Sequence, residues 1–184
     1  MVGMDKGTLM RLAASYLGEA GCVAGTPMEE ALEDCVQHAV SLALDYTHWD
    51  FALERVVVPV VGGVVELPAD CLEVRTVEGM ERWRKQGRYL VPVGVVPEGE
   101  VVLWYKSSRL LDTVMLPDEE PFFCEGVALL LAAKAAPRVS SNFNLSAGLE
   151  ERAYRALYRA KLKEARQADS NDQKPSTEEL WASI

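Results

Sequence analysis

The feature that most constrains the fold is a change in hydrophobic periodicity along the chain. Apolar residues recur at helical spacing before residue 50 and after residue 117, whereas the segment between them is rich in valine and alternates with a period of two. A chain of 184 residues corresponds to one domain, or to one domain with a modest insertion. We therefore predict a mainly α fold with a β insertion, in which a four-helix antiparallel bundle is interrupted by a small antiparallel sheet.

The predicted boundaries follow these changes in pattern. Residues 1–50 and 117–169 are expected to form the helical bundle, residues 51–116 the antiparallel β insertion, and residues 170–184 a flexible C-terminal tail. The tail is rich in Ser, Asn, Asp, Gln, Lys, Pro and Glu, so it cannot bury enough apolar surface to order itself.

The second and third predicted helices have distinct signatures. The second begins at Thr26, where a capping hydroxyl, a following proline and Glu29 three residues later form a capping box. The third, from Pro121 to Ala136, is apolar almost all round, which is typical of a central buried helix. Pro137 is expected to end it, because proline cannot continue the backbone hydrogen-bond ladder.

About five strands are predicted in the β insertion. Gly62 and Gly63 between two valine-rich runs predict a two-residue hairpin turn. Pro59 is expected on an edge strand, because it cannot donate a hydrogen bond to a neighbouring strand. In the run that starts at Cys71, alternation predicts that one side of the strand carries Leu72, Val74 and Thr76.

The fourth predicted helix, about Leu145 to Asp169, carries a basic stripe beside its apolar stripe. The basic residues step by three and four positions, so they share one face. A solvated charged face is the simplest interpretation, contact with the acidic start of the second helix on a neighbouring copy is the second, and DNA contact is the third. DNA ranks last because the formal charge of the chain is −9. The second interpretation predicts a subunit interface formed by Glu29, Glu30, Glu33, Arg152, Arg155, Arg159 and Lys163.

The last residues of the sequence form an apolar group after a polar segment. Leu180, Trp181 and Ile184 follow the stretch of polar residues that begins at Ser170. Such an arrangement is expected of a tail that folds onto a partner, and we predict that these three residues are its anchor. Docking of Trp181 on its own domain and a frayed chain end are the alternatives.

Motifs for catalysis and metal binding are absent from the sequence. It contains no nucleophile elbow, phosphate-binding loop, zincin motif or dinucleotide fingerprint. The four cysteines form no close pairs and the chain has only two histidines, which argues against a structural zinc site. We therefore predict no catalytic residue, no metal and no cofactor. We also expect neither a secretion signal, because Arg11 interrupts the first apolar run, nor a membrane span.

One enzymatic alternative can still be assembled from scattered residues. Cys71 would be the nucleophile of a small cytoplasmic enzyme, with a histidine as base and an aspartate to orient it. The candidates for the base are His38 and His48, and those for the orienting carboxylate are Asp70 and Asp45. A protein-binding module whose basic helix meets an acidic partner is a further alternative.

Several short motifs occur in an order that points to a known family. His48–Ala52 follows the second helix, a valine-rich strand comes next, and Leu67–Val74 contains a Leu-Pro pair. Further along come the remaining motifs: Tyr89–Val91, Val102–Tyr105, Leu116-Pro117, Tyr154, Ala165, Ala168 and Asp169. From about Leu9 to Asp169 the chain resembles the head-to-tail adaptor family of short-tailed phages, also called tail tubular protein A or tail accessory factor.

The resemblance implies a structural virion protein, made in the host cytoplasm, that is not an enzyme. Family members are helical bundles with a β insertion that assemble as a ring, typically a dodecamer, beneath the portal protein. The ring extends the DNA channel, with DNA as passing cargo, and presents a platform for the tail or nozzle protein. A C-terminal extension tends to engage the portal, which would assign that role to residues 170–184 here.

Overall fold

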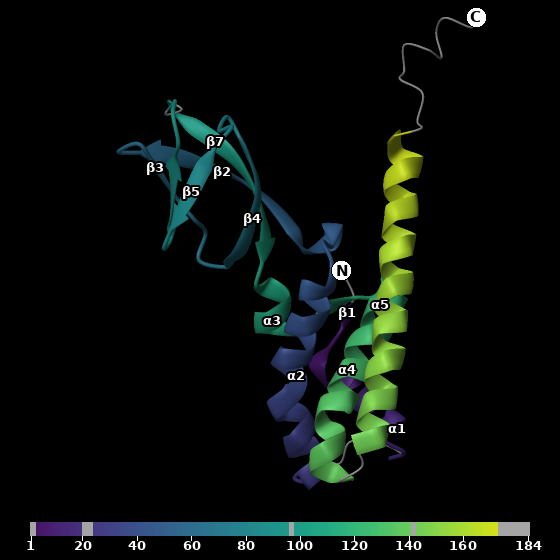
Figure 1. The fold of residues 1–184 in the computed structure, drawn as a ribbon. Coiled ribbons are helices and arrows are strands. Elements are labelled where there is room, and N and C mark those ends of the chain that lie inside the picture. The colour runs from purple at the N-terminus through teal and green to yellow at the C-terminus, as the bar shows by residue number, and fades with distance from the viewer. Residues whose placement is uncertain (1–2, 20–23, 96–97, 141–142, 173–184) are drawn as a thin grey trace, which may run out of the picture. The chain divides into compact units, whose positions relative to one another are not determined.

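The structure is a computed structural model that describes residues 3–19, 24–95, 98–140 and 143–172. The chain divides into two compact units, which we call the helical unit and the half-barrel unit (Figure 1). The helical unit takes in residues up to Trp49 and residues from Met115 onward, and the half-barrel unit is Asp50–Val114. The elements of the helical unit are β1 (Gly3–Met4), α1 (Lys6–Tyr16), α2 (Pro27–Tyr46), β8 (Leu116–Pro117), α4 (Pro121–Val139) and α5 (Phe143–Asp172).

The half-barrel unit is a curled six-stranded antiparallel sheet with a short helix at each end of its sequence. Its strands lie in the order β4-β7-β2-β3-β6-β5, so β4 and β5 form the two edges. The elements in chain order are a 3-10 helix (Asp50–Ala52), β2 (Leu53–Val61), β3 (Val64–Glu66), β4 (Cys71–Glu78), β5 (Trp83–Gln86), β6 (Tyr89–Pro92), β7 (Glu100–Ser107) and α3 (Arg109–Thr113).

The predicted fold class, a four-helix bundle interrupted by a small sheet, is wrong. Of the residues that the structure describes, 52% are helical and 26% are in strands, and the six-stranded half-barrel is a major part of the fold. The half-barrel has its own core, which explains why it is more than an insertion on a helical body. The buried residues of that core are Val65, Leu67, Val74, Val77, Met80, Leu90, Val101, Leu103 and Tyr105.

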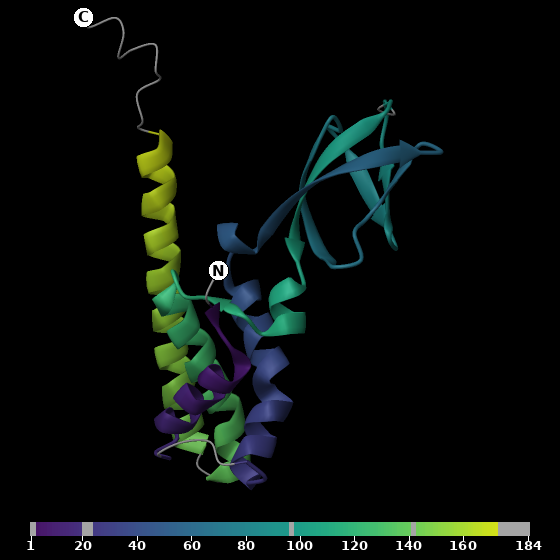
Figure 2. The same cartoon turned by 180° about the vertical axis from the view of Figure 1, so that it is seen from behind.

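Within the helical unit, α4 is the central element. It packs against α1, α2 and α5, and Figure 2 shows α1 lying across it. The prediction of a buried apolar helix at this position is confirmed, because twelve of its residues are buried. The Trp49 ring meets the Phe123 ring edge-on at 5.1 Å, and the Trp49 indole donates a hydrogen bond to the Ala43 carbonyl at 2.8 Å.

Close contact between α4 and α5 depends on a glycine. A Cβ atom added to Gly126 would lie 2.6 Å from Cδ2 of Leu157, which is fully buried. The Leu157 side chain therefore fills the space that any larger residue at position 126 would need. Small residues on the facing side of α5, Ala153, Ala156 and Ala160, are buried as the sequence predicts.

The predicted start of α2 is confirmed. The Thr26 hydroxyl accepts a hydrogen bond from the Glu29 backbone N–H at 3.3 Å. The Glu29 carboxylate in turn accepts one from the Gly25 backbone N–H at 2.6 Å. The two side chains satisfy backbone donors at the helix start in the reciprocal manner of a capping box.

The prediction that Pro137 ends α4 is wrong, because the helix continues to Val139. Proline in a helix removes the N–H that would reach the carbonyl four residues earlier, which here belongs to Ala133. The Ser146 hydroxyl of α5 donates a hydrogen bond to this Ala133 carbonyl at 2.8 Å. A side chain from the neighbouring helix thus satisfies the acceptor that the proline leaves open.

In the half-barrel, the predicted Gly62-Gly63 turn is confirmed, whereas the edge position of Pro59 is wrong. Both glycines have positive φ, and Val61 pairs with Val64 across the turn. β2 lies inside the sheet, between β7 and β3. The sheet tolerates Pro59 because no backbone donor is needed at that position. The hydrogen bond to the β7 side is made by the next residue, whose N–H donates to the Gly99 carbonyl, and the pairing with β3 begins only at Val60.

The predicted alternation on β4 is also wrong. Leu72 and Thr76 are exposed while Val74 is buried. The register with β7 shifts twice along this strand, between Cys71 and Glu73 and between Val74 and Thr76. Each irregularity adds a residue and reverses the facing of those that follow, so a strict period of two fails. On β7, which is regular, the predicted burial of Val101, Leu103 and Tyr105 is confirmed.

Candidate functional site

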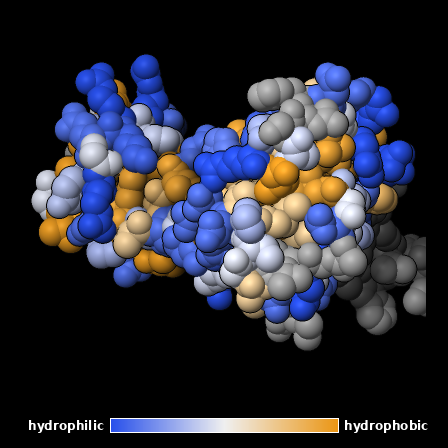
Figure 3. Space-filling model, turned by 90° about the horizontal axis from the view of Figure 1, so that it is seen from below, coloured by the Kyte–Doolittle hydropathy of each residue, from blue (hydrophilic) through white to orange (hydrophobic). Residues whose placement is uncertain are grey.

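The helical unit has a largely hydrophilic surface on which a few large hydrophobic residues remain exposed. Seen from the end at which α4 and α5 connect, hydrophobic residues (orange) gather in one area with hydrophilic residues around them (Figure 3). The most regular exposed set lies on α5, where Tyr154, Tyr158 and Leu162 recur every four residues. Residues four apart lie on one side of a helix, so these three form a continuous strip.

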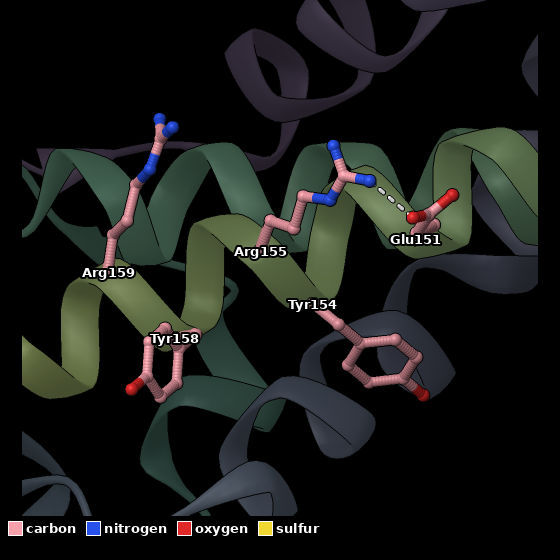
Figure 4. Close-up of a pocket in the computed structure, with 5 residues that line it drawn as sticks. All are labelled: Glu151, Tyr154, Arg155, Tyr158 and Arg159. Carbon is pink, nitrogen blue, oxygen red and sulfur yellow. Dashed lines mark hydrogen bonds and ion pairs between the residues drawn. The ribbon is translucent and has the colours of Figure 1, made fainter.

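Arginines lie next to this strip. Arg155 and Arg159 follow the two tyrosines by one position each, which sets them on the adjoining side of α5. In the view of Figure 4 the two arginines extend above α5 and the two tyrosines below it. We call Tyr154, Arg155, Tyr158, Arg159 and Leu162 the tyrosine–arginine face.

This face borders a shallow, open pocket of about 480 Å³. Its lining consists of Glu151 and the two tyrosine–arginine pairs. The Tyr154 ring stacks on Tyr46 of α2, with centroids 5.9 Å apart and planes 28° from parallel. This stack fixes the Tyr154 ring, which is 38% exposed, whereas Tyr158 is 53% exposed. A fixed aromatic ring beside an exposed one forms a hydrophobic binding surface, and the fixed ring loses little side-chain conformational entropy when a partner binds.

The arginines of the face are turned to solvent. Arg155 forms an ion pair with Glu151 one turn earlier, and both side chains are about two-thirds exposed. Such an exposed pair contributes only about 0.2–1 kcal/mol to stability, so Arg155 can exchange Glu151 for another carboxylate at small cost. Arg159 is exposed as well.

Two other predicted interface residues on α5 are engaged within the helical unit. The Arg152 guanidinium lies over the Tyr16 ring of α1, 5.3 Å from its centroid. The Lys163 ammonium donates hydrogen bonds to the Glu119 carbonyl at 2.6 Å and to the Glu120 carboxylate at 3.0 Å. Both side chains therefore help to hold α5 on the unit.

The predicted acidic partners on α2 have different surroundings. Glu29 caps its own helix, and Glu33 is paired with Lys6 of α1. Glu30 is exposed. Of the three, Glu30 is the exposed carboxylate for which the described residues show no ion pair or capping contact.

The three predicted tail residues, Leu180, Trp181 and Ile184, lie outside the described residues. Sequence reasoning did not single out Tyr158 and Leu162 as surface residues, although a signal was present. Their spacing places them beside the apolar stripe of α5 instead of within it. Tyr154 was noted only as part of a family motif.

Within the half-barrel unit, the surroundings of Cys71 disfavour the thiolate form. Burial and the nearby Asp70 carboxylate raise the pKa of Cys71, although Lys85 opposes them. The Asp70 carboxylate accepts hydrogen bonds from the Ser107 hydroxyl at 2.6 Å and the Tyr105 hydroxyl at 3.2 Å. The Asp70 carboxylate is therefore bound to two residues of β7 and stabilises the sheet. Both histidines of the chain belong to the helical unit, so the half-barrel unit offers Cys71 no imidazole.

We expect slow alkylation of the described thiols in the native chain. Burial is the main cause that raises the pKa of Cys35, Cys71 and Cys124, the last from 9.0 to about 11. A raised pKa means less thiolate below that pH, for Cys124 roughly a hundredfold less. Mass spectrometry of peptides after iodoacetamide treatment should show each thiol reacting more slowly than in urea. Faster reaction of Cys71 in the native chain would support the enzymatic alternative.

Among the described residues, no group of three or more His, Cys, Asp or Glu side chains could hold a metal ion. None of the described helices combines the length and the apolar character that a bilayer span requires. Comparison with protein-family models and with curated proteins finds no match for the chain.

Proposed function

We propose that the chain is a structural head-to-tail adaptor of a phage virion, which forms a ring between the portal protein and the tail and extends the DNA channel. The observation that carries the proposal is the tyrosine–arginine face on α5. Aromatic residues and arginine are the side chains most enriched at the centres of protein–protein interfaces. The order of motifs that resembles the adaptor family supplies the identity of the partners.

A ring requires two complementary surfaces on each subunit, which meet head to tail and close by symmetry. In this proposal the tyrosine–arginine face is one of them, and the surface around Glu30 on α2 of the next copy is the other. Arg152 and Lys163 contribute indirectly, because they hold α5 in place on its own unit.

Charge reversal tests this interface. The double substitution Arg155→Glu and Arg159→Glu should weaken ring formation by at least about tenfold, because it sets like charges against Glu30. The measurement is native mass spectrometry of the chain mixed with the portal ring encoded by the same phage.

A matched control carries the same change of charge away from the face. Arg11 on α1 and Arg84 on β5 are both exposed, and neither belongs to α5. Arg11→Glu with Arg84→Glu should leave ring formation unchanged. Undiminished rings in the Arg155 and Arg159 variant would contradict the proposed interface.

A binding module whose basic helix, α5, meets an acidic protein or DNA is the alternative function. It predicts binding to duplex DNA that weakens steeply as salt is raised, because binding to phosphates releases counterions. The adaptor proposal predicts no such binding by the free chain.

A further inference from the structure

The tyrosine–arginine face is the largest regular hydrophobic strip on α5 that the described residues leave uncovered. Tyr158 and Leu162 are 53% and 40% exposed, on the side of α5 opposite to the residues that pack on α4. Large apolar side chains gathered in this way usually have an occupant in solution.

The C-terminal sequence of the chain has the chemistry of such an occupant. Glu178 and Glu179 precede Leu180 and Trp181, so two carboxylates are followed directly by two large apolar side chains. The face carries the matching groups: arginines, which pair with carboxylates, on one side, and tyrosines with a leucine on the other. Charge and hydrophobicity are therefore complementary between segment and face.

The length of the chain allows the contact within one molecule. α5 ends at Asp172, and Trp181 follows nine residues later, which an extended chain spans with at most about 30 Å. Tyr158 lies fourteen residues before Asp172, which corresponds to about 21 Å along the helix. The difference leaves enough length for the chain to reverse direction.

The order of the residues also fits. A segment that runs back along α5 brings Glu178 to the helix before Trp181. Glu178 follows Asp172 by six residues, which span at most about 20 Å, and the reversal beside the helix uses about 10 Å of that length. Glu178 therefore comes to the level of Arg166, an exposed residue that lies seven positions after Arg159 on the same side of α5. Trp181 then comes to the level of Tyr158.

We propose that in the free chain residues 178–184 fold back along α5 and place Trp181 against Tyr158, with Glu178 and Glu179 beside Arg166. This docking does not depend on the adaptor function. If the chain is an adaptor, the docked segment and a neighbouring subunit compete for one face, and a ring contact there requires the segment to leave.

The test uses the full chain alone, labelled with 5-fluorotryptophan. The chain has four tryptophans, and loss of one fluorine resonance in Trp181→Phe assigns the signal of Trp181. We expect this resonance to differ from its position in urea and to show a small solvent isotope shift, because the docked indole is shielded from water. Tyr158→Ala should return it to the position found in urea, and Arg11→Ala on α1 should leave it in place.

A second variant covers the case in which Tyr158→Ala disturbs the fold. Arg166→Glu retains the tyrosines and repels the two glutamates, so it should shift the Trp181 resonance in the same direction. A Trp181 resonance that is equal in native buffer and in urea would overturn the proposal. A position that depends on protein concentration would also overturn it, because a second copy would then be the occupant. No portal protein is present, so either failure leaves the adaptor proposal untouched.

Discussion

Replacement of Leu157 by alanine should lower the free energy of unfolding of the helical unit by about 3 kcal/mol. Leu157 is fully buried between α4 and α5, and its side chain lies against Gly126. Buried Leu→Ala substitutions cost about 2–5 kcal/mol, with the larger values where the surroundings cannot collapse into the cavity. A glycine has no side chain that could move into this space. Urea unfolding followed by far-UV circular dichroism measures the change, and hydrogen exchange locates it in the helical unit.

A pair of glycines provides the matched control for this contact. Gly126→Ala should destabilise the chain, because its Cβ would lie 2.6 Å from the buried Leu157 side chain. Gly148→Ala on α5 should stabilise it by up to about 1 kcal/mol, because no atom lies within 4 Å and alanine favours the helix. Combined with Leu157→Ala, Gly126→Ala should cost less than it does alone. Equal effects of the two glycine substitutions would contradict the close packing of α4 on α5.

Removal of residues 173–184 should abolish attachment to the portal and leave both units folded. The cut follows Asp172, where α5 ends, so it removes no residue of the described helices. The lost segment contains the three residues predicted to anchor the tail, Leu180, Trp181 and Ile184. Trp181→Ala should reproduce most of the loss, because a large aromatic side chain typically dominates a small interface. A pull-down on the portal ring measures attachment, and circular dichroism confirms that the helices are retained.

Thr177→Ala is the control within the same segment, since it removes a hydroxyl but no apolar anchor, and it should bind the portal like the unchanged chain. Portal binding that survives the removal of residues 173–184 would assign attachment to another surface.

The helices of this chain follow from local sequence signals, whereas the sheet depends on pairings that such signals do not specify. The start of α2 is determined by Thr26 and Glu29, which act within one turn of each other. The continuation of α4 past Pro137 depends on Ser146, which only the folded chain brings to the Ala133 carbonyl. Local sequence signals therefore predict the position of α4 correctly but not the residue at which it ends.

Strand patterns failed where the register changes. β5, with Arg84, Lys85 and Gln86 exposed on an edge of the sheet, has no alternation of apolar and polar residues and was not predicted. The two irregularities of β4 are visible only against its partner β7. Because curvature and register arise from pairing, the size of the half-barrel was underestimated.

The location of the candidate site on α5 could be predicted from the sequence, but the residues that are free to bind a partner could not. Spacing alone places Arg152, Arg155 and Arg159 on one face of α5. The packing of α1 and α4 against α5 determines which cations have a partner within the unit. The Arg152 guanidinium lies over the Tyr16 ring, and the Lys163 ammonium donates a hydrogen bond to the Glu120 carboxylate. The exposure of Tyr158 is likewise a result of how α5 lies on α4.

The central claim is that this chain works by binding other proteins, as a ring joined to a portal. It is tested most directly by native mass spectrometry of the chain mixed with the portal ring encoded by the same phage. We predict one discrete complex in which every portal ring carries a complete ring of this chain. A portal whose mass is unchanged by an excess of the folded chain would contradict the account.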